Sequence, residues 1–403
     1  MRSDASSDSG SMRILKVADV RGIGIGGINS FMRKTGAELV RQGHRVDYLF
    51  QEDLHPRLIP LPLRRLLAPW LITWKVFRRQ RRGAGYSVVE IQEWTAGAYP
   101  LVRKLLPALG LPPCVVISYG AAERHWRAQR ERWQAVGRRG SLKSRLWFPI
   151  SQLPQSRYAL ANADYVLVSS EKDAEYVNAK LGVERERIGR ADSAVGSEYF
   201  SLQKRSRRDE ETRLLFIGNW IDRKGIPEIC AAWSSLRRHR SLRLTLACTV
   251  KPEQAVLESF NGHSDRITVM PRLSEEELKE VIVGHDLFLL PAWFEGGAPI
   301  AAIQAAAAGL PCIVTDIGGN ADVFRPQDPE ADGGILIAPH DAEGLTKAIE
   351  RLVREPELAE RLGRSAKARA RDFTWEVTAA QSLTAYIAAA ATDDAQRLVP
   401  QRA

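Results

Sequence analysis

The segment around Glu295 combines a carboxylate with glycines directly after an apolar run. The run Leu287–Leu290 has the length and composition of a buried strand. Glu295 follows this run and stands beside Gly296 and Gly297. Glycines let backbone N–H groups approach a phosphate, and a carboxylate accepts hydrogen bonds from sugar hydroxyls. Glu295 is therefore predicted to contact a sugar in a loop that also holds phosphate.

Two adjacent cations, Arg223 and Lys224, follow another apolar run, Arg213–Ile217, which is also predicted to be a strand. Paired cations at the carboxyl end of a strand suit a diphosphate leaving group, because they neutralise the charge that develops on it. The alternative interpretation is a solvated surface pair, which is common for any Arg-Lys sequence.

The segment Arg21–Gly27 is rich in glycine and lies between a predicted strand, Arg13–Val20, and a predicted helix, Asn29–Arg41. Such a turn lets backbone N–H groups approach phosphate oxygens at the positive end of the helix dipole. It predicts an anion site, and a tight turn without a ligand is the alternative. Its glycines also match G-x-G-x-x-G, for which an acid at the end of the second strand, Glu52 or Asp53, would hold the ribose of a nicotinamide cofactor.

Short apolar runs alternate with amphipathic helical stretches in both halves of the 403-residue chain, which predicts two parallel α/β sheets. The further strands are predicted at His44–Phe50, Tyr86–Ile91, Cys114–Ser118, Tyr165–Ser169, Leu242–Cys248, Ile267–Met270 and Cys312–Thr315. The expected architecture is two doubly wound Rossmann-like domains that face one another. The site would then lie in the cleft at the carboxyl ends of the strands.

The predicted domain boundaries follow changes in composition. Residues 1–11 are polar and are expected to form a disordered leader, and the charged, aperiodic segment 203–212 is expected to be the linker. The first Rossmann-like domain would span 12–202, and the second would span 213–375. The last segment, 376–403, contains a helix that is expected to pack back on the first domain.

Composition excludes collagenous, disulfide-scaffold and integral-membrane proteins. Charged residues make up 26% and hydrophobic residues 44% of the chain, and no apolar run approaches the roughly 20 residues of a membrane-spanning helix. The four cysteines form no CxxC pair. We therefore expect buried thiols in a reducing cytoplasm, with neither a disulfide framework nor a metal site.

The net charge of +10 is concentrated in two patches of the first half. Arg57–Arg82 holds eight Lys or Arg and no acid, and Arg124–Arg145 holds eight and one acid. Both interleave Arg with Trp and Leu, which is typical of contact with a membrane surface and would suit a lipid-linked acceptor at its inner face. An Arg-rich surface without a partner is the alternative. Nucleic acid is not expected, because no nucleic-acid-binding motif is present.

The chain resembles the retaining glycosyltransferases of family 4, which have the GT-B fold of two Rossmann-like domains. The resemblance extends over roughly Arg13–Ala391. It rests on short motifs of glycine, acidic and aromatic residues: Ala163–Glu175, Gly196–Phe200, Gly218–Gly225 and Leu287–Gly319. The last is the most specific, because Pro-x-x-x-Glu-Gly, Ala-Gly-Leu-Pro and Thr-Asp-x-Gly-Gly follow in order. The resemblance implies transfer of a sugar from a nucleotide diphosphate-sugar, with retention at the anomeric carbon and with neither a metal nor a cofactor.

The resemblance also implies roles for individual residues. Glu295 would contact the donor sugar, and Lys224 with Arg223 would neutralise the departing diphosphate. Backbone N–H groups would bind the diphosphate or the sugar, and these belong to Gly26, Gly27, Gly297 and Ala298.

Three positions depart from the family pattern. Gln304 stands where a second glutamate usually holds the ribose, and it follows Glu295 after eight residues rather than seven. Asn219 replaces an arginine on the diphosphate side, and Tyr119 replaces a histidine on the acceptor or sugar side. Because glutamine donates and accepts hydrogen bonds but carries no charge, altered ribose recognition is expected.

The sequence therefore predicts a cytoplasmic glycosyltransferase, with peripheral contact to the inner membrane face, that acts on a glycan, lipid-linked or small-molecule acceptor in polysaccharide or secondary-metabolite synthesis. Two alternatives stay open. A GT-B protein that binds without catalysing is supported by the three departures. A nicotinamide-dependent oxidoreductase would use the glycine turn, but it would leave Arg223, Lys224 and Glu295 without a role.

Overall fold

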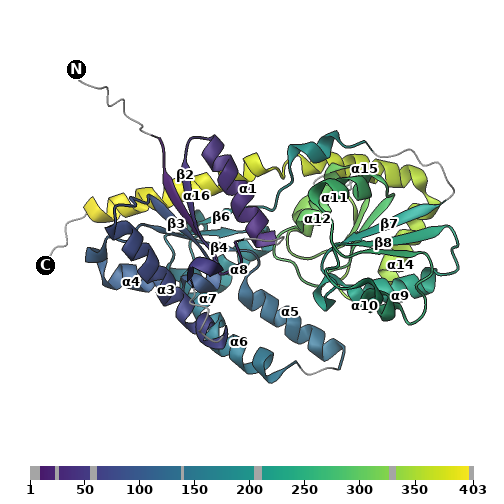
Figure 1. Ribbon diagram of the computed structural model, residues 1–403, viewed down its shortest axis with the longest axis horizontal. Coiled ribbons are helices and arrows are strands. Elements are labelled where there is room, and N and C mark those ends of the chain that lie inside the picture. The colour runs from purple at the N-terminus through teal and green to yellow at the C-terminus, as the bar shows by residue number, and fades with distance from the viewer. Residues whose placement is uncertain are drawn as a thin grey trace, which may run out of the picture. The chain divides into compact units, whose positions relative to one another are not determined.

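The chain divides into two compact units. The first comprises residues 1–191 together with 375–403, and the second comprises 192–374. The computed structural model describes residues 10–22, 27–54, 61–137, 140–203, 211–325 and 333–398. Most of the expected leader and of the expected linker lies outside the described residues. Each unit contains one parallel sheet flanked by helices (Figure 1).

The sheet of the first unit has six strands in the order β2-β1-β3-β4-β5-β6, all parallel. The strands are β1 (Arg13–Val17), β2 (Arg45–Leu49), β3 (Val88–Gln92), β4 (Cys114–Ser118), β5 (Tyr165–Val168) and β6 (Ile188–Arg190). The strands from β3 to β5 are almost wholly buried, which is why they are continuous apolar runs in the sequence.

The helices of the first unit include one that returns from the far end of the chain. They are α1 (Gly27–Arg41), α2 (Gln51–Leu54), α3 (Leu61–Arg81), α4 (Tyr99–Leu105), α5 (Ala122–Ala135), α6 (Phe148–Ser151), α7 (Leu153–Asn162), α8 (Glu171–Leu181) and α16 (Trp375–Leu398). Short turns of helix are η1 (Glu93–Ala96), η2 (Pro107–Leu109), η3 (Lys143–Trp147) and η4 (Arg185–Arg187). The returning helix, α16, packs against α1 and against strands of the first sheet.

The sheet of the second unit also has six parallel strands, in the order β12-β11-β10-β7-β8-β9. The strands are β7 (Thr212–Ile217), β8 (Leu242–Ala247), β9 (Ile267–Met270), β10 (Leu287–Leu290), β11 (Cys312–Thr315) and β12 (Ile335–Ile337). Its helices are α9 (Ile226–Leu236), α10 (Glu253–Leu257), α11 (Glu275–Val283), α12 (Ile300–Ala307), α13 (Asn320–Phe324), α14 (Ala342–Arg354) and α15 (Pro356–Ala370), with the turns η5 (Ser197–Ser201), η6 (Asp222–Lys224) and η7 (Glu258–Phe260).

The predicted fold class, two doubly wound parallel sheets, is confirmed. Two edge strands, β6 and β12, were not predicted, because three residues are too few to show the spacing of apolar residues that is typical of a strand. The first predicted strand was too long at its end: β1 stops at Val17, and the following residues form bends.

The centre of the first sheet contains a charged pair. Lys16 on β1 lies 2.9 Å from Glu90 on β3, and both side chains are at most 1% exposed. The hydroxyl of Tyr386 on α16 donates a hydrogen bond to the other oxygen of Glu90. A buried charge costs several kcal/mol unless it is paired and hydrogen-bonded. These contacts therefore fasten α16 to the interior of the first unit.

Candidate functional site

The strand order of the second sheet reverses between β7 and β10. These strands are hydrogen-bonded neighbours, yet β8 and β9 continue on one side of them while β11 and β12 continue on the other. Connections that leave the carboxyl ends of such a pair diverge, and ligands of open α/β sheets bind at this point. Arg223 and Lys224 follow β7, and Glu295 follows β10, so the topology brings both predicted segments to the same edge.

The three side chains form one ion cluster. Glu295 Oε1 lies 2.6 Å from Lys224 Nζ and 3.0 Å from a terminal nitrogen of Arg223. The same Arg223 nitrogen donates to the backbone carbonyl of Phe294 at 2.8 Å. The side chain of Glu295 is 11% exposed and that of Lys224 is 15% exposed. Two cations therefore face one carboxylate, which leaves a net positive charge in a largely buried place.

Glu295 is held in its ionised form. Burial alone would raise the pKa of its carboxyl group, but the charges of Lys224 and Arg223 outweigh burial and lower this pKa below its ordinary value. Both cations contact Oε1, whereas Oε2 accepts no hydrogen bond from the described residues. The second oxygen can therefore accept a hydrogen bond from a sugar hydroxyl without disturbing the ion pairs.

Two glycines with positive φ allow the backbone segments of the site to touch. A methyl group on Gly225 (φ +79°) would lie 2.0 Å from the carbonyl oxygen of Pro291. One on Gly318 (φ +46°) would lie 2.1 Å from the carbonyl oxygen of Glu295. Any larger residue would push the Glu295 loop away from its neighbours on that side. The motifs quoted above contain both glycines, but sequence reasoning assigned neither a role.

The Glu295 loop leads into α12 through two residues whose backbone N–H groups have no partner among the described residues. Gly297 and Ala298 donate no backbone hydrogen bond to any described residue. Pro299 caps α12 and offers no side-chain hydrogen bond to the first turn. Helix N-termini of this kind attract anions, because unpaired N–H groups and the helix dipole act together.

Gln304, on α12, is held by a residue that the sequence analysis did not select. Its amide nitrogen donates to the phenol oxygen of Tyr199 over 2.8 Å, and both side chains are buried. Burial raises the pKa of Tyr199, so its hydroxyl stays neutral and can accept this bond. Tyr199 lies in Gly196–Phe200, so the motif was visible although the contact was not. Whether Gln304 binds ribose stays a prediction.

Asn219 lies in the segment between β7 and η6 and is exposed. Its backbone carbonyl accepts from the N–H of Ile221 at 2.8 Å, and its side chain makes no hydrogen bond to the described residues. The predicted role of Asn219 toward the diphosphate stays a prediction.

The glycine turn of the first unit is only partly visible. Gly26 lies outside the described residues, and Gly27 begins α1 with open space around it. The N–H of Gly22 donates to the carboxylate of Glu52 at 2.9 Å, and this bond lowers the pKa of Glu52. Asp53 accepts from the N–H of Phe50 at 3.0 Å. Both candidates for the acid that a nicotinamide site would need, Glu52 and Asp53, therefore accept local backbone hydrogen bonds.

Tyr119 follows β4 in the first unit. Its ring packs edge-on against Phe31, with 5.1 Å between ring centroids. Its hydroxyl is buried without a hydrogen-bond partner among the described residues, and burial raises its pKa well above the ordinary value. The predicted contact of Tyr119 with an acceptor or sugar stays a prediction.

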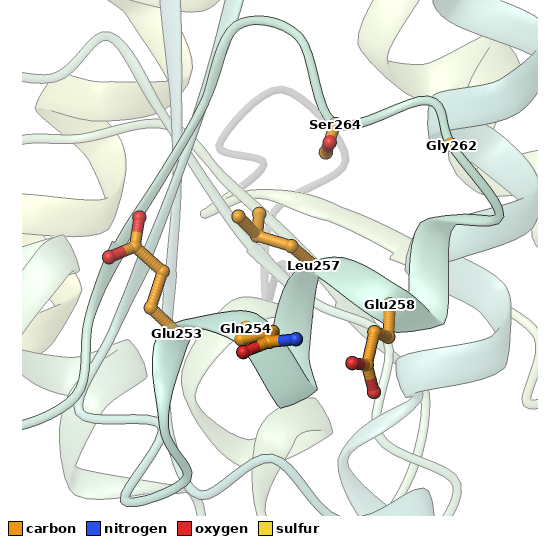
Figure 2. Close-up of a pocket in the computed structure, with 6 residues that line it drawn as sticks. All are labelled: Glu253, Gln254, Leu257, Glu258, Gly262 and Ser264. Atoms are coloured by element: carbon orange, nitrogen blue, oxygen red, sulfur yellow. The ribbon is translucent and has the colours of Figure 1, made fainter.

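No group of three or more His, Cys, Asp or Glu side chains in the described ranges is arranged to hold a metal ion. A hollow of the second unit lies beside α10 and the turn that follows it (Figure 2). Its lining residues are Glu253, Gln254, Leu257, Glu258, Gly262 and Ser264. None of the predicted site residues lines this hollow.

Two parallel six-stranded α/β sheets, one in each unit, are the arrangement of the GT-B class of fold. Sucrose-phosphate synthase from Thermosynechococcus elongatus has a similar structure, with a TM-score of 0.73, 20% identity, and coverage of 94% of this chain and 100% of that chain. The family model described as glycosyl transferases group 1 matches residues 211–355, and the glycosyl transferase 4-like domain matches 26–189. The chain belongs to this family of glycosyltransferases.

Two curated relatives are also similar to the chain in sequence. The chain is 26% identical to MMP alpha-(1->4)-mannosyltransferase of Mycolicibacterium hassiacum over 247 residues, which cover 60% of this chain and 58% of that protein. It is 24% identical to D-inositol 3-phosphate glycosyltransferase of Nocardia farcinica over 393 residues, which cover 90% and 85% of the two chains. The match to the mannosyltransferase thus spans less than two thirds of that relative's length.

Proposed function

We propose that this protein is a retaining glycosyltransferase that transfers a sugar from a nucleotide diphosphate-sugar to an acceptor hydroxyl. The observation that carries the proposal is the cluster of Lys224, Arg223 and Glu295, set where β7 and β10 end. The cluster joins a net positive charge to a carboxylate oxygen that has no partner among the described residues. A negatively charged leaving group and a hydroxylated sugar match these two features.

In the proposed reaction, the bond between the anomeric carbon and the diphosphate oxygen breaks, and the acceptor oxygen bonds to the same face of that carbon. Lys224 and Arg223 stabilise the charge that grows on the departing diphosphate. The N–H groups of Gly297 and Ala298, just before α12, stabilise the same negative charge by donating hydrogen bonds. Glu295 Oε2 orients a sugar hydroxyl, and the acceptor proton passes to a departing phosphate oxygen. This chemistry requires no metal, because the cations of the chain supply the charge.

The acceptor is proposed to be a glycan, a lipid-linked sugar or a small molecule, as in polysaccharide or secondary-metabolite synthesis. The four cysteines are all free thiols, which supports a reducing compartment such as the cytoplasm. A protein that binds a nucleotide-sugar without transferring it is the second candidate. The exposed Asn219 and the uncharged Gln304 favour that candidate.

A thermal-shift panel tests the proposal. UDP, GDP, ADP, TDP, their sugar conjugates, NAD and NADP are each added to the full chain. A ligand that binds only the folded state at 100 times its Kd stabilises it by about 2.7 kcal/mol, so one nucleoside diphosphate should raise the Tm clearly. A shift with NAD alone, or with no diphosphate, would overturn the proposal. Release of the nucleotide from the matching sugar conjugate then separates the transferase from the silent binding protein.

A further inference from the structure

Helix α3 exposes a continuous apolar stripe. Its members recur at helical spacing on one face and are between 36% and 54% exposed: Leu63, Leu66, Leu67, Trp70 and Trp74. Large apolar side chains gathered on a surface usually mark a contact with another apolar phase, whereas single ones are ordinary. Two tryptophans at one face make this stripe unlike the scattered exposed leucines elsewhere.

The stripe is a second apolar face, because α3 already has one in the core. Ala68, Ile72 and Val76 are fully buried. Ile72 and Val76 belong to the same buried cluster as Leu54 and Tyr99. Packing of the first unit therefore explains one side of α3 and leaves the stripe unexplained.

Cations border the stripe. Lys75 Nζ lies 5.9 Å and the Arg78 guanidinium 5.2 Å from the ring centroid of Trp74. Arg81 and Arg82 are exposed where the helix ends. Over Arg57–Arg82 the sequence contains eight basic residues and no acid. A partner that matches this surface must therefore offer apolar groups to the stripe and negative charges to the cations that border it.

A second stripe has the same character. Leu142, Leu146 and Ile150 are 72%, 57% and 69% exposed at a spacing of four residues, with the exposed Arg145 between them. This stripe begins one residue before η3 and continues through η3 into α6. Helices α3 and α7 both contact η1, and α6 contacts α7, so the two stripes lie on neighbouring elements of the first unit (Figure 1).

We propose that the α3 stripe binds the surface of an anionic lipid bilayer, with α3 lying in the plane of the interface. Leucine and tryptophan side chains would enter the boundary between head groups and acyl chains, and Lys75, Arg78, Arg81 and Arg82 would contact the anionic head groups. Indole rings favour this boundary, because they combine a large apolar surface with one polar N–H group. The attachment is peripheral: no helix in the described ranges is long and apolar enough to cross a bilayer.

Co-sedimentation of the full chain with vesicles tests this proposal without any sugar donor. Vesicles of phosphatidylglycerol and phosphatidylcholine should bind the protein, and vesicles of phosphatidylcholine alone should bind it at least about tenfold more weakly. Raising the salt from about 0.1 M to about 1 M should weaken the binding, because the Debye length falls from about 10 Å to about 3 Å. Equal binding to both vesicle types, or no binding to either, would overturn the proposal.

Matched variants locate the surface. Trp70→Gln/Trp74→Gln should weaken vesicle binding at least about tenfold, whereas Val377→Gln/Ile387→Gln, a pair of exposed apolar residues on α16, should not. Unchanged binding by the tryptophan variant, at an unchanged Tm, would overturn the proposal.

A charge-reversal pair covers the case in which the tryptophan variant does not fold. Lys75→Glu/Arg78→Glu should lose binding, and Arg361→Glu/Arg364→Glu on α15 should retain it. An equal loss in the two pairs would show that net charge alone drives attachment and would contradict the proposal. So would binding of a single-stranded RNA in place of vesicles. Donor cleavage measured without vesicles should be the same in all these variants, so failure of the membrane surface is distinct from failure of the proposed transferase.

Discussion

The amide nitrogen of Gln304 donates a hydrogen bond to the phenol oxygen of Tyr199, and both side chains are buried. The bond bears on the prediction that Gln304 stands where the family resemblance places a ribose-binding carboxylate. The amide nitrogen is turned toward Tyr199, and the amide oxygen makes no hydrogen bond to the described residues. We therefore propose that Tyr199 is a positioning residue, because its bond to the amide nitrogen leaves the amide oxygen of Gln304 for a ligand.

Replacing Tyr199 by phenylalanine tests this role. Tyr199→Phe leaves a buried amide without its acceptor, which should lower the free energy of unfolding by about 1–3 kcal/mol. It should also raise the KM for the donor more than it lowers kcat, since Gln304 loses its fixed orientation. Tyr158→Phe is the control, because the Tyr158 hydroxyl bonds to none of the described residues. An unchanged KM in Tyr199→Phe would show that the bond is structural only.

Lys224→Ala tests the stabilisation of the leaving group. Turnover should fall by about 10²–10³, because the lost charge acts mainly in the transition state. Steady-state kinetics at saturating donor measure this effect. The exposed Lys251→Ala should retain full turnover. Equal rates for the two variants would remove Lys224 from the mechanism.

Glu295→Gln should impair handling of the donor sugar more than binding of the nucleoside diphosphate. The substitution keeps the shape of the side chain but frees Lys224 and Arg223 from their counter-charge. Calorimetry should therefore find binding of the nucleoside diphosphate retained, while kcat/KM for the sugar conjugate falls. Glu253→Gln, in the hollow of Figure 2, serves as the control. If binding of the diphosphate falls as much as kcat/KM does, Glu295 only supports the loop.

The backbone contact beneath Glu295 can be tested with two alanines of similar strain. Gly318→Ala and Gly182→Ala both place a methyl group at positive φ, but only the first meets another atom, the carbonyl oxygen of Glu295 at 2.1 Å. Gly318→Ala should therefore weaken donor binding and turnover, whereas Gly182→Ala should cost only about 1 kcal/mol of stability. Similar activity in the two variants would show that the loop adjusts without loss.

The pH dependence of stability should reveal Glu123 on α5. Hydrogen bonds from Arg157, Tyr176 and Arg127 lower the pKa of this carboxyl group from 4.5 to about 2. Because the folded-state pKa is the lower one, the contribution is complete above about pH 4.5 and disappears as the pH falls toward about 2.

Glu123→Gln should therefore have a lower Tm than the wild-type chain at pH 7, and the difference should shrink in this acid range. Glu131 is exposed on the same helix, and Glu131→Gln should have the Tm of the wild-type chain both at pH 7 and in the acid range. A constant gap for Glu123→Gln across the acid range would contradict the assignment.

The strands were predictable where they are continuous apolar runs. Cys114–Ser118, Ile267–Met270, Leu287–Leu290 and Cys312–Thr315 have the same bounds in the sequence analysis and in the structure. The sequence placed Arg223 with Lys224 and Glu295 after two predicted strands, but it did not predict the ion pairs that join them. The bond between Gln304 and Tyr199 did not follow, because 105 residues separate the partners and no local period links them.

The fastening of α16 to Glu90 sets an order of assembly during synthesis. Residues 192–374 leave the ribosome as one stretch and can complete the second unit, whereas the first unit waits for Tyr386. Until then, Glu90 lacks one of its buried partners, and β3 to β6 lack the helix that contacts them in the folded protein. The part that is made first is thus finished last. We therefore expect a nascent chain that is paused before Trp375 to be the form of this protein most in need of chaperones.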